Sequence, residues 1–327
     1  MMLGSVAIGS LAATLRASRG LAAKHDIAAV AAQLGLSGAS AIPVGDDCAA
    51  IPDGDGFLLL AIEGFINEFV AADPWFAGWC GVMVNISDVA AMGGRPLAVV
   101  DAVWAAGEDN ATPMVAGLRA ASQAFGVPIV GGHTNTRCDR GQLSVAILGR
   151  ANRLLTSFDA KPGDQLVAAI DLRGRYREPF ANWEAFTNAP AARLRGDIAL
   201  LPAIAEAGLA RACKDISQGG IIGTTIMLAE CSGVGAIIDV LRVPRPDGVS
   251  LERWLQTFPS FGYLLAIPPP NVPDALARFA ARNITAAEIG TITGGDHVEI
   301  TDGRVNEVVW DFAQSPLIGC RTAEAIG

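Results

Sequence analysis

A long, almost uncharged helix predicted over residues 73–91 constrains the fold more than any other part of the sequence. Its first two residues, Asp-Pro, suit an N-cap and a first helical turn, and Gly93 lies where the helix should end. Asn85 and Asp88 are three residues apart inside this apolar stretch, so both side chains project from one face. A buried carboxylate needs a partner. The helix therefore predicts either a structural aspartate that caps a neighbouring loop or a ligand for a cation.

Helices and strands alternate along the rest of the chain, which indicates an α+β protein built of layered α/β domains. Apolar runs bounded by turn residues predict strands at 57–62, 97–104, 143–149, 166–170, 235–240, 262–267, 287–293 and 297–300. Helical spacing and glycine stops predict further helices at 11–35, 111–125, 197–209, 221–232 and 273–282. The stretch 171–196 is polar and is expected to be irregular.

The length and one turn suggest where the chain divides. A chain of 327 residues is long enough for two domains. The turn at residues 161–164, Lys-Pro-Gly-Asp, precedes a new predicted strand. We therefore expect an N-terminal domain over 1–155 and a C-terminal domain over 156–327.

Composition excludes several classes of protein. The net charge is −9 and no block of lysine and arginine occurs, so a nucleic-acid-binding surface is not expected. Six cysteines are scattered without a CxxC pair, which fits reduced thiols in the cytoplasm. Residues 1–15 lack a basic segment and are too short and small-sided to span a membrane. We expect a cytoplasmic protein that binds neither membrane nor nucleic acid.

Acidic residues in the first half suggest a cation site. Asp46 and Asp47 follow Gly45 in a turn, and adjacent carboxylates repel one another unless a cation or hydrogen bonds compensate. Glu63 ends the predicted strand 57–62, where its side chain can reach the edge of a sheet. Magnesium prefers oxygen ligands, so these acids with Asp88 predict a magnesium site. The alternatives are an ordinary acidic surface turn and a first exposed residue after a strand.

A glycine pair followed by histidine forms a second group. Gly131 and Gly132 follow an apolar run, and paired glycines let the backbone approach a phosphate closely. His133 and Thr134 come next, and His133 is one of three histidines in the chain. His133 is a candidate for steering a proton or a phosphate oxygen. The alternative is a hydrogen-bonded structural histidine in a plain glycine turn.

The second half offers an anion site and a group of arginines. Ser217 and the glycines 219 and 220 follow Asp215 and precede a predicted helix, so Ser217 suits an N-cap and the helix N-terminus suits an anion. The alternative is an ordinary cap and turn. The polar stretch beyond residue 171 carries arginines that could bind a phosphate or carboxylate through two hydrogen bonds. These arginines are Arg173, Arg175 and Arg177. The alternative is that they belong to a solvated loop and bind no ligand.

These segments together resemble one superfamily. It contains aminoimidazole ribonucleotide synthetase, thiamine-monophosphate kinase, selenophosphate synthetase and a hydrogenase-maturation dehydratase subunit. Residues 84–96 are similar to the N-x-S-D-x-A-A-M-G-x-x-P helix of these proteins almost letter for letter. The Gly-Asp-Asp turn at 45–47, the Gly-Gly-His-Thr run at 131–134, the turn at 161–164 and the Asp-Ile-Ser-Gln-Gly-Gly run at 215–220 occur in the expected order.

The resemblance implies a fold and a site. It implies two α/β-layered domains of the aminoimidazole ribonucleotide synthetase type, with the N-terminal domains of two subunits pairing into a β-barrel. It also implies a homodimer that binds ATP between its domains. The implied magnesium ligands are Asp46, Asp47, Asp88 and Asp215, with Glu63 as a further ligand of longer reach. From the residues and the resemblance together we expect His133 and Asp88 to act in catalysis and Arg173, Arg175 and Arg177 to bind substrate. The expected nucleotide contacts are Asn85, Gly131, Gly132, Thr134, Ser217, Gly219 and Gly220.

Departures from the family patterns leave the reaction open. Glu63 stands where many relatives have Asp, His133 replaces an Asp of the thiamine-monophosphate kinases, and Gln218 replaces another. The chain therefore resembles an uncharacterised branch. The main expectation is ATP- and magnesium-dependent phosphoryl transfer to a small molecule. The alternatives are an amidine-forming ATP-dependent synthetase and a non-catalytic nucleotide-binding subunit that regulates or scaffolds a partner.

Overall fold

The computed structural model describes residues 7–34 and 43–320, which divide into two compact units. The five-strand unit consists of residues 47–154 and 188–206, and the seven-strand unit consists of 1–46, 155–187 and 207–327. The units are interleaved along the chain, whereas the expectation from the sequence was a single division at residue 155.

The five-strand unit contains a mixed sheet and five helices. The strand order is β1-β2-β5-β3-β4, antiparallel except for the parallel pair β3 and β4. The strands are β1 (Ala49–Asp53), β2 (Gly56–Gly64), β3 (Arg95–Ala106), β4 (Ile129–Asn135) and β5 (Arg137–Ala151). The helices are α4 (Asn67–Ala72), α5 (Pro74–Ala91), α6 (Glu108–Phe125), α7 (Ala191–Ile198) and α8 (Leu200–Glu206).

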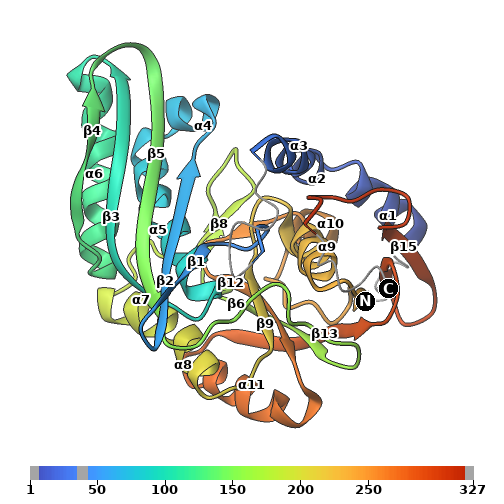
Figure 1. Cartoon of the computed structure of the whole chain (residues 1–327). Coiled ribbons are helices and arrows are strands. Elements are labelled where there is room, and N and C mark those ends of the chain that lie inside the picture. The colour runs from blue at the N-terminus through green and yellow to red at the C-terminus, as the bar shows by residue number, and fades with distance from the viewer. Residues whose placement is uncertain (1–6, 35–42, 321–327) are drawn as a thin grey trace. The chain divides into compact units, whose positions relative to one another are not determined.

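Helices α5 and α6 lie against one face of this sheet (Figure 1). The carboxylate of Asp73 accepts a hydrogen bond from the backbone N–H of Phe76 at 3.1 Å, so the predicted N-cap of α5 is confirmed. A methyl group added at Gly78 would lie 2.0 Å from the carbonyl oxygen of Met114, and one at Gly117 would lie 1.9 Å from that of Trp75. Only glycine therefore allows these two helix backbones to approach so closely.

The opposite face of the sheet carries exposed apolar side chains. Side chains alternate between the two faces of a strand. On β2 and β5 the buried side chains Leu59, Ala61 and Ile147 face the helices, while Leu60 and Ile62 point the other way and are 48% and 69% exposed. We call this surface the open face; its other exposed apolar residues include Val100 and Leu148.

The seven-strand unit is built around a mostly antiparallel sheet of order β15-β14-β10-β13-β6-β12-β9. Its strands are β6 (Gln165–Ile170), β9 (Ala212–Asp215), β10 (Gly235–Asp239), β12 (Gly262–Ile267), β13 (Thr285–Thr293), β14 (His297–Thr301) and β15 (Asn306–Asp311). A small sheet pairs β7 (Arg175–Tyr176), β8 (Asn182–Glu184) and β11 (Phe258–Pro259). The helices are α1 (Ile8–Arg16), α2 (Arg19–Ala22), α3 (His25–Leu34), α9 (Gly220–Ser232), α10 (Leu251–Leu255) and α11 (Val272–Ala280).

Helix α9 is the core helix of this unit. Every residue of α9 from Gly220 to Cys231 is buried, and the adjoining strand β12 is buried along its whole length. A strand buried on both faces needs a layer on each side. Helix α9 supplies one layer over β12, and α11, whose Phe279 and Ala275 are fully buried, packs on β13, which is separated from β12 by β6.

Several predicted elements need correction. The single helix expected over 11–35 is three helices, because the hydroxyl of Ser18 accepts a hydrogen bond from the N–H of Leu21 and starts a new helix; residue 35 lies outside the described residues. The helix expected over 197–209 is the pair α7 and α8. The stretch 171–196 is not wholly irregular, since it contains β7, β8 and the start of α7.

No helix within residues 7–34 and 43–320 is both long and apolar enough to cross a membrane.

Candidate functional site

Two of the predicted acidic ligands lie close together in the five-strand unit. A carboxylate oxygen of Asp47 lies within 4.8 Å of one from Asp88. Asp88 is 5% exposed near the C-terminal end of α5, and Asp47 is half-buried just before β1. The backbone N–H of Cys48 contacts the sulfur of Met92 at 3.0 Å, which fixes the Asp47 segment against the end of α5.

This pair of carboxylates suits a divalent cation. Two carboxylates at this spacing repel one another unless positive charge or a proton offsets the repulsion. Carboxylate oxygens are the ligands that Mg²⁺ selects, and the ion usually keeps several waters when it binds one or two carboxylates. The donor type and the spacing of Asp47 and Asp88 therefore fit magnesium.

Asn85, one helical turn before Asp88, joins α5 to the sheet. Its side-chain amide donates to the carbonyl of Gly81 at 2.8 Å and to the carbonyl of Val145 on β5 at 3.0 Å. The side chain is fully buried, and its oxygen has no hydrogen-bond partner within the described part of the chain. This burial favours a role in holding α5 in place over direct contact with phosphate.

Two further acids lie on the helix-covered face of the sheet. Glu63 and Asp101 both pair with Val145 in register, from β2 and β3 respectively, so the three form one row across the sheet. Asp101 was not among the predicted site residues. Its burial raises the pKa of its carboxyl group. The signal for it was present, because Asp101 is the one acid inside the predicted strand 97–104.

The predicted Gly-Gly-His-Thr loop is an edge strand, β4, rather than a loop. A methyl group added at Gly132 would lie 2.8 Å from Oδ1 and 2.6 Å from the backbone oxygen of Asp101. Gly132 therefore makes room for Asp101. By contrast, a methyl group at Gly131 would meet only Val100, at 4.0 Å.

The sheet separates His133 from Asp88. The ring of His133 lies 5.9 Å from that of Trp104, centroid to centroid. Trp104 points to the open face, because its neighbours Val103 and Ala105 are buried on the helix side. His133 is thus not brought together with Asp88 on α5 within this unit, and Thr134 is exposed on the edge strand β4.

Asp46 lies in the seven-strand unit and is bound by a serine that sequence reasoning missed. The backbone N–H and the hydroxyl of Ser157 donate to its two carboxylate oxygens at 2.9 and 2.7 Å. Ser157 is fully buried, and its carbonyl accepts from the hydroxyl of Ser232 at 2.7 Å. Hydrogen bonds of this kind stabilise the charged form of a carboxylate and fix its direction.

The predicted anion site in the same unit differs from the expectation. Asp215 is buried at the end of β9, as a predicted ligand requires. Ser217 does not cap α9: the N-cap is Gly219, which has no side chain, and Ser217 accepts only through its backbone oxygen, from the N–H of Gly220. Gly220 has a φ of +62°, and an added methyl group would lie 2.1 Å from the carbonyl oxygen of Leu255. Gly220 is therefore required for packing against α10.

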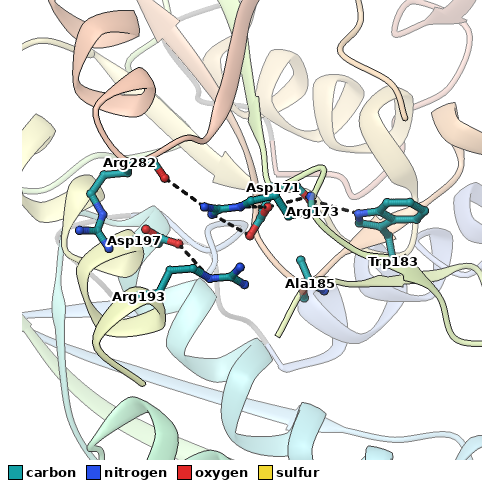
Figure 2. Close-up of polar contacts among 8 residues, drawn as sticks. Asp171, Arg173, Trp183, Ala185, Arg193, Asp197 and Arg282 are labelled. Atoms are coloured by element: carbon teal, nitrogen blue, oxygen red, sulfur yellow. Dashed lines mark hydrogen bonds and ion pairs between the residues drawn. The ribbon is translucent and has the colours of Figure 1, made fainter. Parts of the chain in front are cut away.

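The three predicted substrate arginines are largely engaged with the protein itself. Arg173 binds both carboxylate oxygens of Asp171, at 2.7 and 3.0 Å, and the carbonyl of Arg282 at 3.3 Å (Figure 2). A guanidinium committed to three acceptors holds β6 to the end of α11. Arg175 contacts the buried Glu184 at 3.0 Å but its side chain is 70% exposed, and Arg177 bonds through its backbone N–H to Asn182. Arg175 is the one whose exposure best suits a substrate.

Family models match both halves of the chain. The N-terminal domain of AIR synthase related proteins matches residues 45–151, and the C-terminal domain of the same proteins matches residues 186–303. An uncharacterised protein of Synechocystis sp. is 49% identical over 281 residues, which is 85% of this chain and 87% of the relative.

Two characterised proteins are also similar. The thiamine-monophosphate kinase of Pyrococcus abyssi is 29% identical over 283 residues, covering 80% of this chain and 86% of the kinase. The structure of Thermotoga maritima PurL complexed with ATP superposes with a TM-score of 0.70 at 21% identity, over 84% of this chain and 46% of PurL. This chain thus spans about half of the PurL chains that it matches, and that likeness shows a shared fold.

Proposed function

Because this chain belongs to the AIR synthase related family, we propose that it binds ATP with magnesium and transfers a phosphoryl group to a small molecule. The observation that carries this proposal is the pair of carboxylates on Asp47 and Asp88, within 4.8 Å of one another. The thiamine-monophosphate kinase among its relatives supports the kinase reaction.

Magnesium, when bound, would neutralise charge on the phosphate groups of the nucleotide. Asp47 and Asp88 would hold the ion, and Asp46, Asp215 and Glu63 are the further ligands that we propose. Phosphoryl transfer depends on positioning more than on covalent chemistry.

The remaining residues have supporting tasks in this proposal. Asn85 and Ser157 are positioning residues: Asn85 fixes α5, which carries Asp88, and Ser157 fixes the carboxylate of Asp46. The backbone N–H of Gly219, at the N-cap of α9, is a proposed contact for the nucleotide, because the N–H groups of Ser217 and Gly220 already donate to the hydroxyl of Thr224 and to the backbone oxygen of Ser217. Gly131 and Thr134, on the edge strand β4, are further proposed backbone contacts. The exposed guanidinium of Arg175 is the proposed contact for an anionic group of the substrate.

We also propose that the chain is a homodimer joined through the open face. Contiguous apolar patches on a protein surface often mark sites of association. Ile62 and Leu60 on β2 are 69% and 48% exposed, and Val100 and Leu148 continue the patch across the sheet. His133 and Trp104 lie on the same face. In such a dimer His133 would serve at the subunit contact and not beside Asp88 of its own chain.

A synthetase is the second candidate function. The relative PurL is named a phosphoribosylformylglycinamidine synthase, and several such proteins match about three quarters of this chain or more. In a synthetase of this kind ATP would activate a carbonyl oxygen so that nitrogen could attack. The same carboxylates serve either reaction, so the substrate decides between them.

Calorimetry with ATP and Mg²⁺ tests the nucleotide site. Asp88→Asn and Asp47→Asn keep the side-chain shape but remove the charge, so magnesium-dependent binding of ATP should weaken at least tenfold. Asp274→Asn, which changes an exposed acid of α11 in the seven-strand unit, is the matched control and should bind normally. Unchanged ATP affinity in Asp88→Asn would remove Asp88 from the site. ADP release is then measured with and without added small metabolites. An enzyme should release ADP when its substrate is added, whereas a nucleotide-binding scaffold should not.

A further inference from the structure

A cavity of about 200 Å³ lies inside the five-strand unit, away from the carboxylate pair. Its walls are formed by α5, the start of β3, the end of α6 and the pair α7 and α8. The apolar side chains that line it include Ile86, Phe125, Ile198 and Pro202. An apolar cavity of about 150 Å³ is sufficient to bind benzene. This cavity can therefore hold an aromatic ring with a small substituent.

Two arginines and no acid belong to the lining. Arg195 donates from Nε to the carbonyl of Ala124 at 3.0 Å and from Nη2 to that of Gln123 at 2.8 Å, at the C-terminal end of α6. Its Nη1 has no hydrogen-bond partner among the described residues. Gly126 accommodates this guanidinium, since an added methyl group would lie 2.9 Å from its central carbon.

Arg95 is held in a similar way. Both of its terminal nitrogens bind Glu206, at 2.6 and 3.0 Å, and its Nε has no partner among the residues that the structure describes. Glu206 binds Arg95, whereas the printed contacts of Arg195 are with backbone carbonyls, so one carboxylate offsets two guanidinium groups and the lining keeps a net positive charge. Guanidinium groups form strong, directed hydrogen bonds with carboxylates.

We propose that this cavity binds a small aromatic carboxylate. The ring lies against Ile86, Phe125 and Ile198, and the carboxylate accepts hydrogen bonds from Nη1 of Arg195 and Nε of Arg95. Size selects a single ring, and the positive lining selects an anion over a neutral compound. A bound ligand contacts α5 at Ile86, two residues before Asp88, and at the same time contacts α7 and α8. The site is separate from the nucleotide site and does not depend on it.

Benzoate and its neutral analogue benzyl alcohol are the probes. Titration calorimetry of the full chain, without nucleotide or magnesium, should give one benzoate per chain, bound at least tenfold more tightly than benzyl alcohol. Methyl NMR spectra should shift for Ile86 and Ile198. Arg195→Met keeps the apolar stem and removes Nη1, so benzoate should bind at least tenfold more weakly while benzyl alcohol is unaffected. Arg119→Met is the matched control, because Arg119 also lies on α6 but lines a different pocket that shares no residue with the proposed cavity.

Ala199→Trp is a second variant that tests the cavity if Arg195→Met unfolds because it loses the hydrogen bonds of Arg195 to α6. Ala199 lines the cavity and is exposed, so a larger side chain is tolerated there and a tryptophan can fill the space. Both probes should then lose binding. The proposal is overturned if wild-type protein does not prefer benzoate to benzyl alcohol, if the isoleucine signals do not shift, or if folded Ala199→Trp binds benzoate as before.

Discussion

Both carboxylate oxygens of Asp46 accept hydrogen bonds from Ser157, one from its backbone N–H and one from its hydroxyl. Ser157→Ala keeps the backbone bond and removes the 2.7 Å hydroxyl bond, so it should lower the free energy of unfolding by about 1 kcal/mol. If Asp46 binds magnesium, the same variant should also weaken the magnesium dependence of ATP binding, because the carboxylate is less well directed. Urea denaturation and calorimetry measure the two effects.

Ser122→Ala is the control for Ser157→Ala. The hydroxyl of Ser122 donates to the carbonyl of Val127, also at 2.7 Å. Ser122 is distant in sequence from every residue that we propose as a magnesium ligand. It should lose similar stability and retain its affinity for magnesium and ATP. Equal affinities in both variants would argue against Asp46 as a ligand.

Asn85→Asp should be among the most destabilising single-atom changes in the five-strand unit. It replaces a buried donor with a carboxylate that faces two carbonyl oxygens, those of Gly81 and Val145. A buried charge without a compensating partner costs several kcal/mol, so we expect a loss of about 3 kcal/mol or more. Asn110→Asp is the matched control, since Asn110 makes the same bond to the carbonyl four residues earlier but is exposed. The control should change stability by under about 0.5 kcal/mol.

Helix α5 illustrates what the sequence could predict. An Asp-Pro start, a glycine stop and an apolar stretch between them are local signals, and they set both ends of the helix correctly. The proximity of Asp47 and Asp88 could be proposed because both motifs resemble those of one family, whose fold brings them together. The break at Ser18 was missed because the apolar spacing continues across it, although a serine N-cap is visible in the sequence.

Long-range pairing accounts for the other errors. A Gly-Gly pair favours a loop when judged locally. Gly132 instead lies in a strand. A glycine is needed there because Asp101, on the neighbouring strand, occupies the space that a side chain would take. The register that pairs these two residues cannot be read from either segment alone. The role of Gly220 likewise depends on Leu255, which is distant in sequence.

Gly132→Ala should therefore destabilise the protein while Gly131→Ala does not. The added methyl group at 132 meets Asp101 at 2.6 to 2.8 Å. Overpacking of this kind typically lowers the free energy of unfolding by about 1–3 kcal/mol. At 131 the same group meets only Val100, at ordinary contact distance. The comparison of the two variants by urea denaturation isolates the steric effect, because both replace an adjacent glycine in β4. Equal stabilities would show that Asp101 can move aside freely.

Asp101→Asn should stabilise the protein at neutral pH. Burial raises the pKa of Asp101 in the folded state above its value of 3.8 in the unfolded chain. Ionisation therefore disfavours the fold once the pH exceeds the folded pKa, and this penalty disappears as the pH falls towards and below 3.8. The melting temperature of Asp101→Asn should exceed that of wild type at pH 7, and the difference should shrink on acidification.

Asp139→Asn serves as the control for that pH dependence. Asp139 is fully exposed, and a hydrogen bond from Arg140 lowers the pKa of its carboxyl group, so its removal should bring no gain at neutral pH. A melting curve for Asp101→Asn that follows wild type at every pH would contradict the penalty assigned to burial.

Ile62→Glu tests the homodimer proposed through the open face. Ile62 is 69% exposed in the middle of the apolar patch, so a charge there should not unfold the chain but should be costly to bury against a second copy. Light scattering after size-exclusion chromatography should give a dimer for wild type and a monomer for Ile62→Glu. Leu241→Glu is the matched control, because Leu241 is a similarly exposed apolar residue, 56% exposed, in the seven-strand unit. If Ile62→Glu remained a dimer, the subunit contact would lie elsewhere than on the open face. The proposed role of His133 at that contact would then be wrong as well.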